Sequence, residues 1–257
     1  MKIATWNVNS IRVRLPQVLE WLHREAPDIL CLQETKITDE EFPVAAFRDA
    51  GYQAVYAGQK TYNGVATLSR RTAEKIVTSL PGADGAQKRL LAATIGKVRV
   101  INVYVPNGEE VGSEKYSYKL SWLAALGKYL ARELKAHPKL ALLGDYNIAP
   151  DERDVHDPKR WAGHVLFSDR ERAAFQELAK LGLVDVFRKF DQPEKSFSWW
   201  DYRAGAFHRN HGLRIDHILC SAKLTAECRE CRIDIEPRKH ERPSDHAPVF
   251  AEFHAAP

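Results

Sequence analysis

The amino-acid sequence predicts an α/β fold: a four-layer sandwich in which two mixed β-sheets pack face to face with helices outside. Strand-like and helix-like segments alternate along the chain, and no low-complexity linker divides them. Two separate stretches repeat one pattern, in which an apolar strand, a helix and a second apolar strand follow one another. The 257 residues also suit one large sandwich, so we expect residues 1–257 to form a single domain.

The first of these stretches begins near the N-terminus. Residues 3–7 read as a strand that ends at the polar Asn7, and residues 14–25 as an amphipathic helix. The apolar side chains of this helix recur every three or four residues and are Leu15, Val18, Leu19 and Leu22. Pro16 is expected in its first turn, where the backbone N–H has no intrahelical partner. Residues 28–33 then form a short buried strand that runs into Glu34.

The second stretch repeats this pattern in the middle of the chain. Residues 101–107 read as a strand, residues 116–135 as a helix and residues 140–146 as a buried strand that contains Asp145 near its end. The core face of the helix is formed by leucines, at positions 120, 123, 126, 130 and 134. Because strands of one sheet end at a common edge, the polar residues that end these strands are expected to meet there.

The remaining elements follow from local patterns. A third helix is expected to begin at Ser168, because Ser168 and Glu171 have the spacing of a capping box. Further strand-like segments cover residues 53–56, 64–69, 90–95, 98–105, 183–187, 198–200, 215–221 and 249–253.

Composition is that of an ordinary soluble protein, with 44% hydrophobic and 28% charged residues. The net charge of +4 permits a polyanionic partner without requiring one. We see no signal peptide and no apolar run of the ~18 residues that a membrane span needs, so a cytoplasmic protein with no membrane partner is expected.

The four cysteines are expected to be structural. Cys31 and Cys220 lie in apolar strands and are expected to be buried thiols. A metal or redox role for Cys228 and Cys231 is disfavoured because no second pair of ligands exists.

Four polar clusters interrupt or end apolar strands. Asp145 and Asn147 are two residues apart on an extended segment, so their side chains point to the same side. His246 follows Ser244 and Asp245, and with Asp216 on a separate strand it could form an oriented Asp–His pair that acts on a phosphate or on water. Taken singly, each cluster is ambiguous: Glu34 reads equally as a solvated carboxylate, and Gly-Asp-x-Asn as a common turn. Tyr104, in mid-strand, reads equally as a core residue.

Together, eight motifs make the chain resemble the exonuclease III-type abasic-site endonucleases, a group within the endonuclease/exonuclease/phosphatase superfamily. The motifs, in order, are WNVNSIR (6–12), LQETK (32–36), GVA (64–66), NVYVPN (102–107), GDYNIAP (144–150), WWDYR (199–203), LRID (213–216) and SDHAP (244–248). They extend over essentially the whole chain. Asn9, where animal members often carry Asp, and the lack of a long basic N-terminal extension indicate the bacterial branch.

The resemblance implies a DNA-repair phosphodiesterase that depends on Mg²⁺, with Mn²⁺ as a substitute. It would cleave duplex DNA 5′ to abasic sites and would also act as a 3′→5′ exonuclease or trim 3′ ends as a 3′-phosphatase or phosphodiesterase. By this resemblance Glu34 ligates the metal with Asn7 and Asp245 nearby, and Asp145 and Asn147 are further candidate ligands. Such a set of oxygen donors suits a hard divalent cation.

The resemblance also implies the catalytic roles. Asp145 would deprotonate the attacking water, with Asn147 holding the water and the phosphate. His246, oriented by Asp216, would hydrogen-bond the scissile phosphate. Three further residues would contact the substrate: Tyr104 at the phosphate or the leaving oxygen, Asn107 on the DNA backbone, and Trp200 in an apolar pocket that receives the flipped-out abasic sugar.

The expected partner is double-stranded DNA with abasic sites or blocked 3′ ends, bound by a monomer in the bacterial cytosol or nucleoid. Candidate phosphate contacts, each of which alone is more typical of a solvated surface charge, are Lys36, Lys60, Arg70, Lys115, Lys119 and Arg209. The polar segment 151–169 is expected to form a loop over the site.

Two other functions are compatible with parts of the pattern. A superfamily phosphatase acting on inositol phosphates or phospholipids would keep Glu34, Asp145 and His246, but the WWDYR motif and the Tyr104 motif argue against it. A catalytically inactive relative that binds nucleic acid should have lost acidic residues, and here all of them are present.

Overall fold

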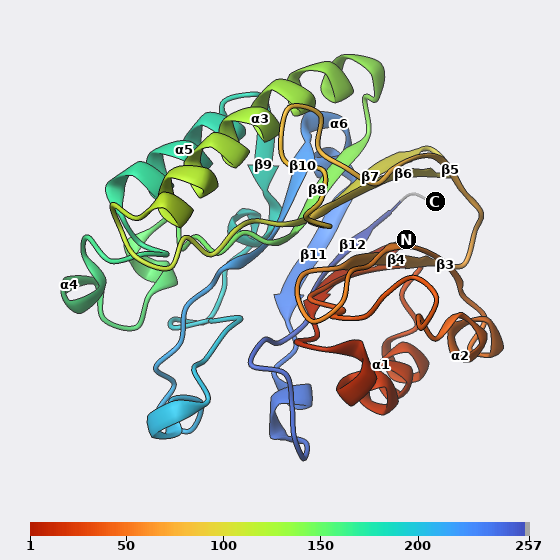
Figure 1. The fold of residues 1–257 in the computed structure, drawn as a ribbon, viewed down its shortest axis with the longest axis horizontal. Coiled ribbons are helices and arrows are strands. Elements are labelled where there is room, and N and C mark those ends of the chain that lie inside the picture. The colour runs from red at the N-terminus through yellow and green to blue at the C-terminus, as the bar shows by residue number, and fades with distance from the viewer. Residues whose placement is uncertain (255–257) are drawn as a thin grey trace.

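The computed structural model describes residues 1–254 and contains two six-stranded mixed sheets with helices on their outer faces (Figure 1). The first sheet has the order β11 (Cys228–Ile233), β12 (Val249–Phe253), β1 (Lys2–Asn7), β2 (Ile29–Gln33), β4 (Val65–Ser69) and β3 (Gln53–Ala57). The second has the order β5 (Ala73–Val77), β6 (Leu90–Ile95), β7 (Val98–Tyr104), β8 (Leu140–Asp145), β10 (Asp216–Ser221) and β9 (Leu183–Asp185). The predicted four-layer sandwich is confirmed.

Helices cover both outer faces, as Figure 1 shows. On the first sheet lie α1 (Ile11–Glu25) and α2 (Val44–Asp49), and on the second α3 (Glu114–Ala136) and α5 (Asp169–Ala179). The short helices α4 (Pro158–Trp161) and α6 (Ala222–Glu227) belong to connections. Within residues 1–254, no helix combines the length and apolar character needed to cross a membrane.

The core consists of three apolar layers. Side chains of both sheets, among them Ile3 and Leu143, fill the space between the sheets. Trp6 of β1 packs against Trp21 of α1 in the second layer, and Leu126 of α3 and Phe175 of α5 belong to the third. Residues along each central strand therefore alternate between an inner and an outer apolar layer, which explains why these strands are apolar throughout.

The two repeated stretches form two equivalent β-α-β units. β1 pairs parallel to β2 across α1, and β7 pairs parallel to β8 across α3, whereas all other pairings among the named strands are antiparallel. Parallel strands end on the same side of a sheet, so Asn7, Glu34, Tyr104 and Asp145 all lie at the carboxyl ends of their strands. The two predicted β-α-β units therefore bring these four side chains to the ends of neighbouring parallel strands.

A buried polar link joins the two sheets directly beneath this edge. The Gln33 amide donates to Asn102 Oδ1 over 2.8 Å, and Asn102 Nδ2 donates to the carbonyls of Leu32 and Ala66. Buried amides need such partners, and these bonds can form only at one relative shift of the sheets. The link therefore aligns the strand ends that carry the polar clusters.

Some predicted boundaries were wrong. α1 begins at Ile11, so Pro16 lies in its second turn rather than its first. Residues 198–200 form no strand, because Trp199 makes only isolated bridges to Leu213 and His246. The edge strands β5 and β11 and the helices α2 and α6 were not predicted; β5 and β11 expose charged residues and so lack a continuous apolar run.

All four cysteines are free and buried. Cys228 and Cys231 lie in β11, where burial raises the pKa of both thiols. A raised thiol pKa disfavours the reactive thiolate, in agreement with a packing role.

Candidate active site

The centre of the polar cluster is a pair formed by His246 and Asp216. Asp216 is the first residue of β10, and its Oδ2 lies 2.8 Å from His246 Nδ1 and accepts from the Ser198 hydroxyl over 2.7 Å. Burial opposes a charge on the imidazole, but the carboxylates of Asp216 and Asp145 raise the pKa of His246 to about 10. The ring is therefore held as an imidazolium whose Nε2–H points away from Asp216.

Asp145, the last residue of β8, lies on the other side of this ring. Its Oδ2 is 3.7 Å from His246 Nε2, and the side chain is 1% exposed. Asn7 Nδ2 donates to Oδ2 over 2.9 Å, and the backbone N–H of Asn147 donates to Oδ1 over 2.8 Å. Burial, together with the nearby Asp216, raises the pKa of Asp145 to about 7, although His246 acts in the opposite direction. A carboxylate with this pKa can exchange a proton near neutral pH.

Glu34 faces Asp145 across Asn7. The same Asn7 amide nitrogen donates to Glu34 Oε1 over 2.8 Å, and Lys36 Nζ lies 2.8 Å from Oε2. Burial opposes its charge, but Lys36 and Asn7 hold the pKa of Glu34 below its ordinary value. Glu34 is therefore a stable carboxylate, whereas Asp145 is a titrating one.

Tyr104 completes the wall beside these carboxylates. Burial raises the pKa of its hydroxyl well above 10, and Glu34 and Asp145 add to the shift. Arg89 stacks on the ring, with its guanidinium carbon 4.7 Å from the ring centroid. The phenol thus stays protonated and can donate a hydrogen bond into the site.

Asn147 and Asn107 lie together next to Asp145. Asn147 has a φ of 49°, a left-handed conformation that Asn tolerates better than most residues, and its Nδ2 donates to the Val105 carbonyl. Asn107 Nδ2 donates to Asn147 Oδ1 over 3.2 Å. Left-handed backbone recurs around the site at Asn9, Glu34 and Lys36, a concentration of strain that is typical of functional sites.

Comparison with known proteins identifies the family. A model described as the endonuclease/exonuclease/phosphatase family matches residues 4–246. The chain belongs to this family. The exodeoxyribonuclease III of Haemophilus influenzae is 39% identical over 266 aligned positions, which cover 98% of this chain and 100% of that protein.

Solved structures agree with this assignment. A 3′ phosphatase from Neisseria, NExo, bound to a product DNA hairpin, is 49% identical to this chain, with a TM-score of 0.97. The match covers 99% of this chain and 100% of the Neisseria chain. An AP endonuclease from Archaeoglobus fulgidus is 42% identical to this chain, with a TM-score of 0.96. The match covers 99% of this chain and 100% of the Archaeoglobus chain. The resemblance found in the sequence is confirmed, and the similarity extends over the whole chain.

The donor set fits the metal on which enzymes of the endonuclease/exonuclease/phosphatase family depend. In residues 1–254, one group of at least three His, Cys, Asp or Glu side chains has its ligand atoms within 4.8 Å of one another: Glu34, Asp145 and His246. Two carboxylates, Asp145 buried and Glu34 partly buried, suit a hard divalent cation, which would also offset their mutual repulsion. Of these three side chains, His246 is also bonded to Asp216 through its Nδ1, over 2.8 Å.

The other expected metal residues are engaged differently. Asn7 turns its NH₂ group toward both carboxylates, while its Oδ1 accepts from the Asn9 backbone. Asp245 accepts from Asn9 Nδ2 on one oxygen and from the Trp199 indole on the other, each over 3.0 Å. In this geometry Asn7 joins the two carboxylates, and Asp245 is held by Asn9 and Trp199.

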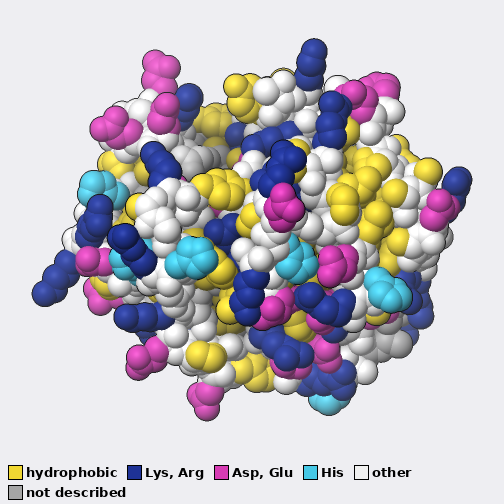
Figure 2. All heavy atoms as spheres, turned by 90° about the horizontal axis from the view of Figure 1, so that it is seen from below, with side chains coloured by type: hydrophobic (Ala, Val, Ile, Leu, Met, Phe, Trp, Pro, Cys, Tyr) yellow, Lys and Arg dark blue, Asp and Glu magenta, His cyan; other side chains and the backbone are white. Residues whose placement is uncertain are grey.

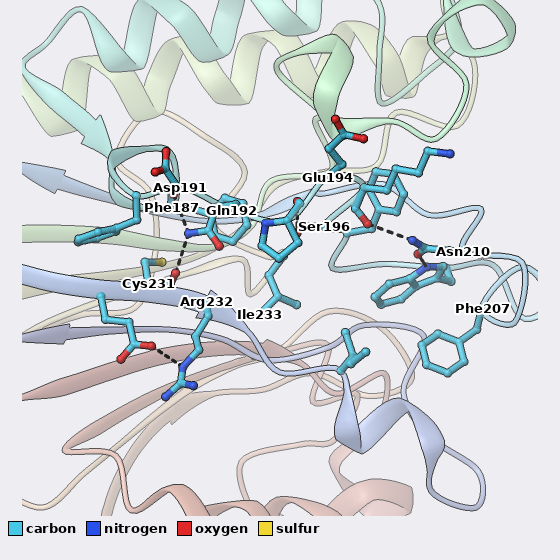
Figure 3. Close-up of a pocket in the computed structure, with 17 residues that line it drawn as sticks. Phe187, Asp191, Gln192, Glu194, Ser196, Phe207, Asn210, Cys231, Arg232 and Ile233 are labelled. Carbon is cyan, nitrogen blue, oxygen red and sulfur yellow. Dashed lines mark hydrogen bonds and ion pairs between the residues drawn. The ribbon is translucent and has the colours of Figure 1, made fainter.

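Trp200, which is expected to line an apolar pocket for the abasic sugar, does line a cavity, but not one beside the carboxylates. It is 2% exposed, and its indole donates to Asn210 at the wall of a cavity of about 660 Å³ that neither Glu34, Asp145 nor His246 lines (Figure 3). Adjacent residues of an extended segment point to opposite sides, so only one of the two tryptophans can face the site. That residue is Trp199, which contacts Asp245 and packs beside Leu213.

Sequence reasoning missed three contacts and misjudged one lysine. Asn9, Ser198 and Trp199 each hold a site carboxylate, and only the motif positions of Asn9 and Trp199 pointed to them. Lys119, a candidate for phosphate contact, has a side chain that is 0% exposed, so that expectation was wrong.

Proposed function

We propose that this protein is a metal-dependent DNA-repair phosphodiesterase that hydrolyses phosphate esters in duplex DNA at abasic sites and at 3′ ends. The observation that carries the proposal is the buried constellation of Asp216, His246 and Asp145. It combines a protonated imidazole and a carboxylate that titrates near neutral pH within 3.7 Å of each other. Full-length similarity to an exodeoxyribonuclease III and to an AP endonuclease supports DNA as the substrate.

In the proposed mechanism, His246 and Asp145 have complementary roles. Asp145, whose Oδ2 lies 3.7 Å from His246 Nε2, accepts a proton from the attacking water. His246 donates its Nε2–H to a phosphate oxygen as negative charge develops, while Asp216 keeps the ring oriented. Tyr104 donates a second hydrogen bond to the phosphate, and Asn147 and Asn107 orient the water and the DNA backbone.

Glu34 and Asp145 are the residues that would hold the metal, and the carboxylate chemistry favours Mg²⁺ with Mn²⁺ as a substitute. When bound, such an ion stabilises the negative charge that accumulates on the phosphate. Asn7 would keep the two carboxylates at a fixed separation through its two hydrogen bonds.

Surface charge supports a nucleic-acid partner. The chain carries 38 Lys and Arg against 34 Asp and Glu, and Figure 2 shows many Lys and Arg side chains on the face seen from below Figure 1. The loops around η3 (Arg203–Gly205) and η4 (Glu236–Lys239) extend toward this face (Figure 1). We propose that a monomer in the bacterial cytosol binds double-stranded DNA here, with Trp199 rather than Trp200 as the aromatic wall.

The test is cleavage of two labelled duplexes, one with an internal abasic-site analogue and one with a 3′-phosphate, each with Mg²⁺ or with EDTA. A Mg²⁺-dependent nick at the abasic site or loss of the 3′-phosphate would support the proposal. The 49% identity to a 3′ phosphatase makes release of the 3′-phosphate the activity to measure first. The Asp145→Asn variant, purified in parallel, controls for contaminating nucleases.

No reaction on either duplex would contradict the proposal. Release of phosphate from an inositol phosphate under the same conditions would then assign the site to a phosphatase of the same family. Tight DNA binding without turnover of any of these substrates would instead indicate an inactive nucleic-acid-binding relative.

A further inference from the structure

A buried lysine lies directly behind the two asparagines of the site. Lys119 is on the second turn of α3, and its side chain is 0% exposed. A buried ammonium group is costly unless it is paired and fully hydrogen-bonded. Its ion-pair partner is Glu171 on α5, also 0% exposed.

The other two hydrogen bonds of this ammonium end on the site itself. Lys119 Nζ donates to the Asn147 carbonyl over 2.6 Å and to the Asn107 carbonyl over 3.0 Å. With Glu171, these contacts use all three donors of the ammonium group. Lys119 therefore joins the two chain segments whose side chains meet through the bond from Asn107 to Asn147.

The backbone at Asn147 is in a conformation that the hydrogen bond from Lys119 would help to maintain. Its φ of 49° is an uncommon conformation for a residue other than glycine. The N–H of this residue holds Asp145 Oδ1 over 2.8 Å, so any relaxation of the Asn147 backbone would also turn the Asp145 carboxylate. A shift of about 1 Å in a catalytic group is enough to slow a reaction on the order of 100-fold.

Glu171 secures the lysine from the opposite side. Besides Lys119, its carboxylate accepts from the backbone N–H groups of Leu166 and Ser168 and from the Ser168 hydroxyl. The bond from the Ser168 backbone N–H is one half of the predicted capping box at the start of α5, and the bond from the Glu171 backbone N–H to the Ser168 hydroxyl is the other half. The ammonium group is thus anchored to a rigid helix terminus.

We propose that Lys119 is a positioning residue for hydrolysis, which acts through the backbone carbonyls of Asn107 and Asn147 and touches neither the substrate nor the metal. The proposal rests on the proposed function of the same site. Lys119 differs from an ordinary buried ion-pair residue. Two of its three hydrogen bonds are made to Asn107 and Asn147, which are expected to contact the phosphate and the water.

The test compares Lys119→Met with a matched control, Arg99→Met. Arg99 is also a buried cation (3% exposed) that pairs with a glutamate, Glu133, and donates to a backbone carbonyl, but it lies at the opposite end of β7 from Tyr104. Lys119→Met should lower kcat at least about 10-fold with KM changed less than about threefold, measured below the melting temperature. Arg99→Met should lose thermal stability and keep kcat within about twofold.

Because Lys119→Met leaves Glu171 buried and unpaired, the double variant Lys119→Met/Glu171→Gln is made in parallel and should fold. Amide hydrogen exchange is recorded for all variants over residues 105–108 and 145–148. Faster exchange there in the Lys119 variants, and not in Arg99→Met, is the expected result. Normal kcat in a folded variant that lacks Lys119 would overturn the proposal.

If the unmodified protein hydrolyses none of the DNA substrates, the proposed function fails and the exchange measurement decides on Lys119 alone. Faster exchange of the two segments would then support its positioning role, and unchanged exchange would reject it.

Discussion

At the scale of single residues, the site separates the protonation states of two groups that touch. Asp216 and Asp145 raise the pKa of His246 to about 10, while burial raises the pKa of Asp145 to about 7. The imidazole is therefore a donor and the carboxylate an acceptor at the same pH. Two neighbouring groups whose pKa values differ in this way can act as the acid and the base of a hydrolase at one pH.

Replacement of Asp145 by Asn should remove turnover and keep DNA binding. The amide cannot accept the proton of water, so the single-turnover rate should fall about 100- to 10,000-fold. Loss of a negative charge should leave the Kd for duplex DNA unchanged or lower it. Asp169→Asn, at a side chain that is 94% exposed, is the control and should behave as the unmodified protein. Near-normal cleavage by Asp145→Asn would remove Asp145 from the role of base.

The pKa of His246 predicts a pH dependence of stability in the metal-free protein. Since the folded-state pKa of about 10 exceeds the ordinary 6.5, the folded state retains this proton where the unfolded state loses it. The free energy of unfolding should therefore fall as pH rises from about 6.5 to about 10. Urea titrations at both ends of this range measure the fall, which should shrink in His246→Gln and persist in His23→Gln. An equal fall in both variants would contradict the assignment.

At the scale of elements, two β-α-β units place the catalytic carboxylates. Each unit ends in a carboxylate at the carboxyl end of a parallel strand: Glu34 after β2 and Asp145 at the end of β8. Close packing at these ends depends on Gly144, where φ is 149° and an added Cβ would lie 1.9 Å from the Val103 carbonyl oxygen. The backbone of β8 thus approaches β7 too closely for any other residue.

The same substitution at two glycines should therefore have opposite effects. In Gly127→Ala, inside α3, the new methyl group would meet Leu178 at an ordinary 3.7 Å, so the helix should gain about 0.5–1 kcal/mol. In Gly144→Ala, the clash with backbone should cost at least about 2 kcal/mol and displace Asp145. Thermal unfolding of the two variants, with kcat measured alongside, tests this contrast. Equal stability of the two would show that the β7–β8 contact can relax.

At the scale of the whole molecule, the first sheet brings together residues that are more than 200 positions apart, because β1 pairs with β12. Asn7 lies in β1 and His246 just before β12, and the Trp6 indole donates to the His246 carbonyl. Every residue of the site depends on the sandwich being closed. A metal held between Glu34 and Asp145 would bind only the folded state and so would stabilise the entire domain.

Addition of Mg²⁺ or Mn²⁺ to metal-free protein should accordingly raise the melting temperature. The gain in unfolding free energy should approach about 2.7 kcal/mol when the metal is at 100 times its Kd. Glu34→Gln should lose most of this gain, and Glu177→Gln, whose side chain is 68% exposed, should keep it. A metal effect that survives Glu34→Gln would place the cation elsewhere.

The sequence by itself determined the fold class, the two β-α-β units and the family, because these depend on apolar periodicity and on motifs read along the chain. The strand ends of the two units predicted that Glu34 and Asp145 would meet, and the family resemblance added His246 to them. The α1 start and the edge strands β5 and β11 were missed where local patterns are weak. Only the tertiary structure decided which of Trp199 and Trp200 faces the site, that Asn7 joins two carboxylates, and that Lys119 is buried behind Asn107 and Asn147. Those contacts are set by packing between distant segments, whose relative orientation no local pattern encodes.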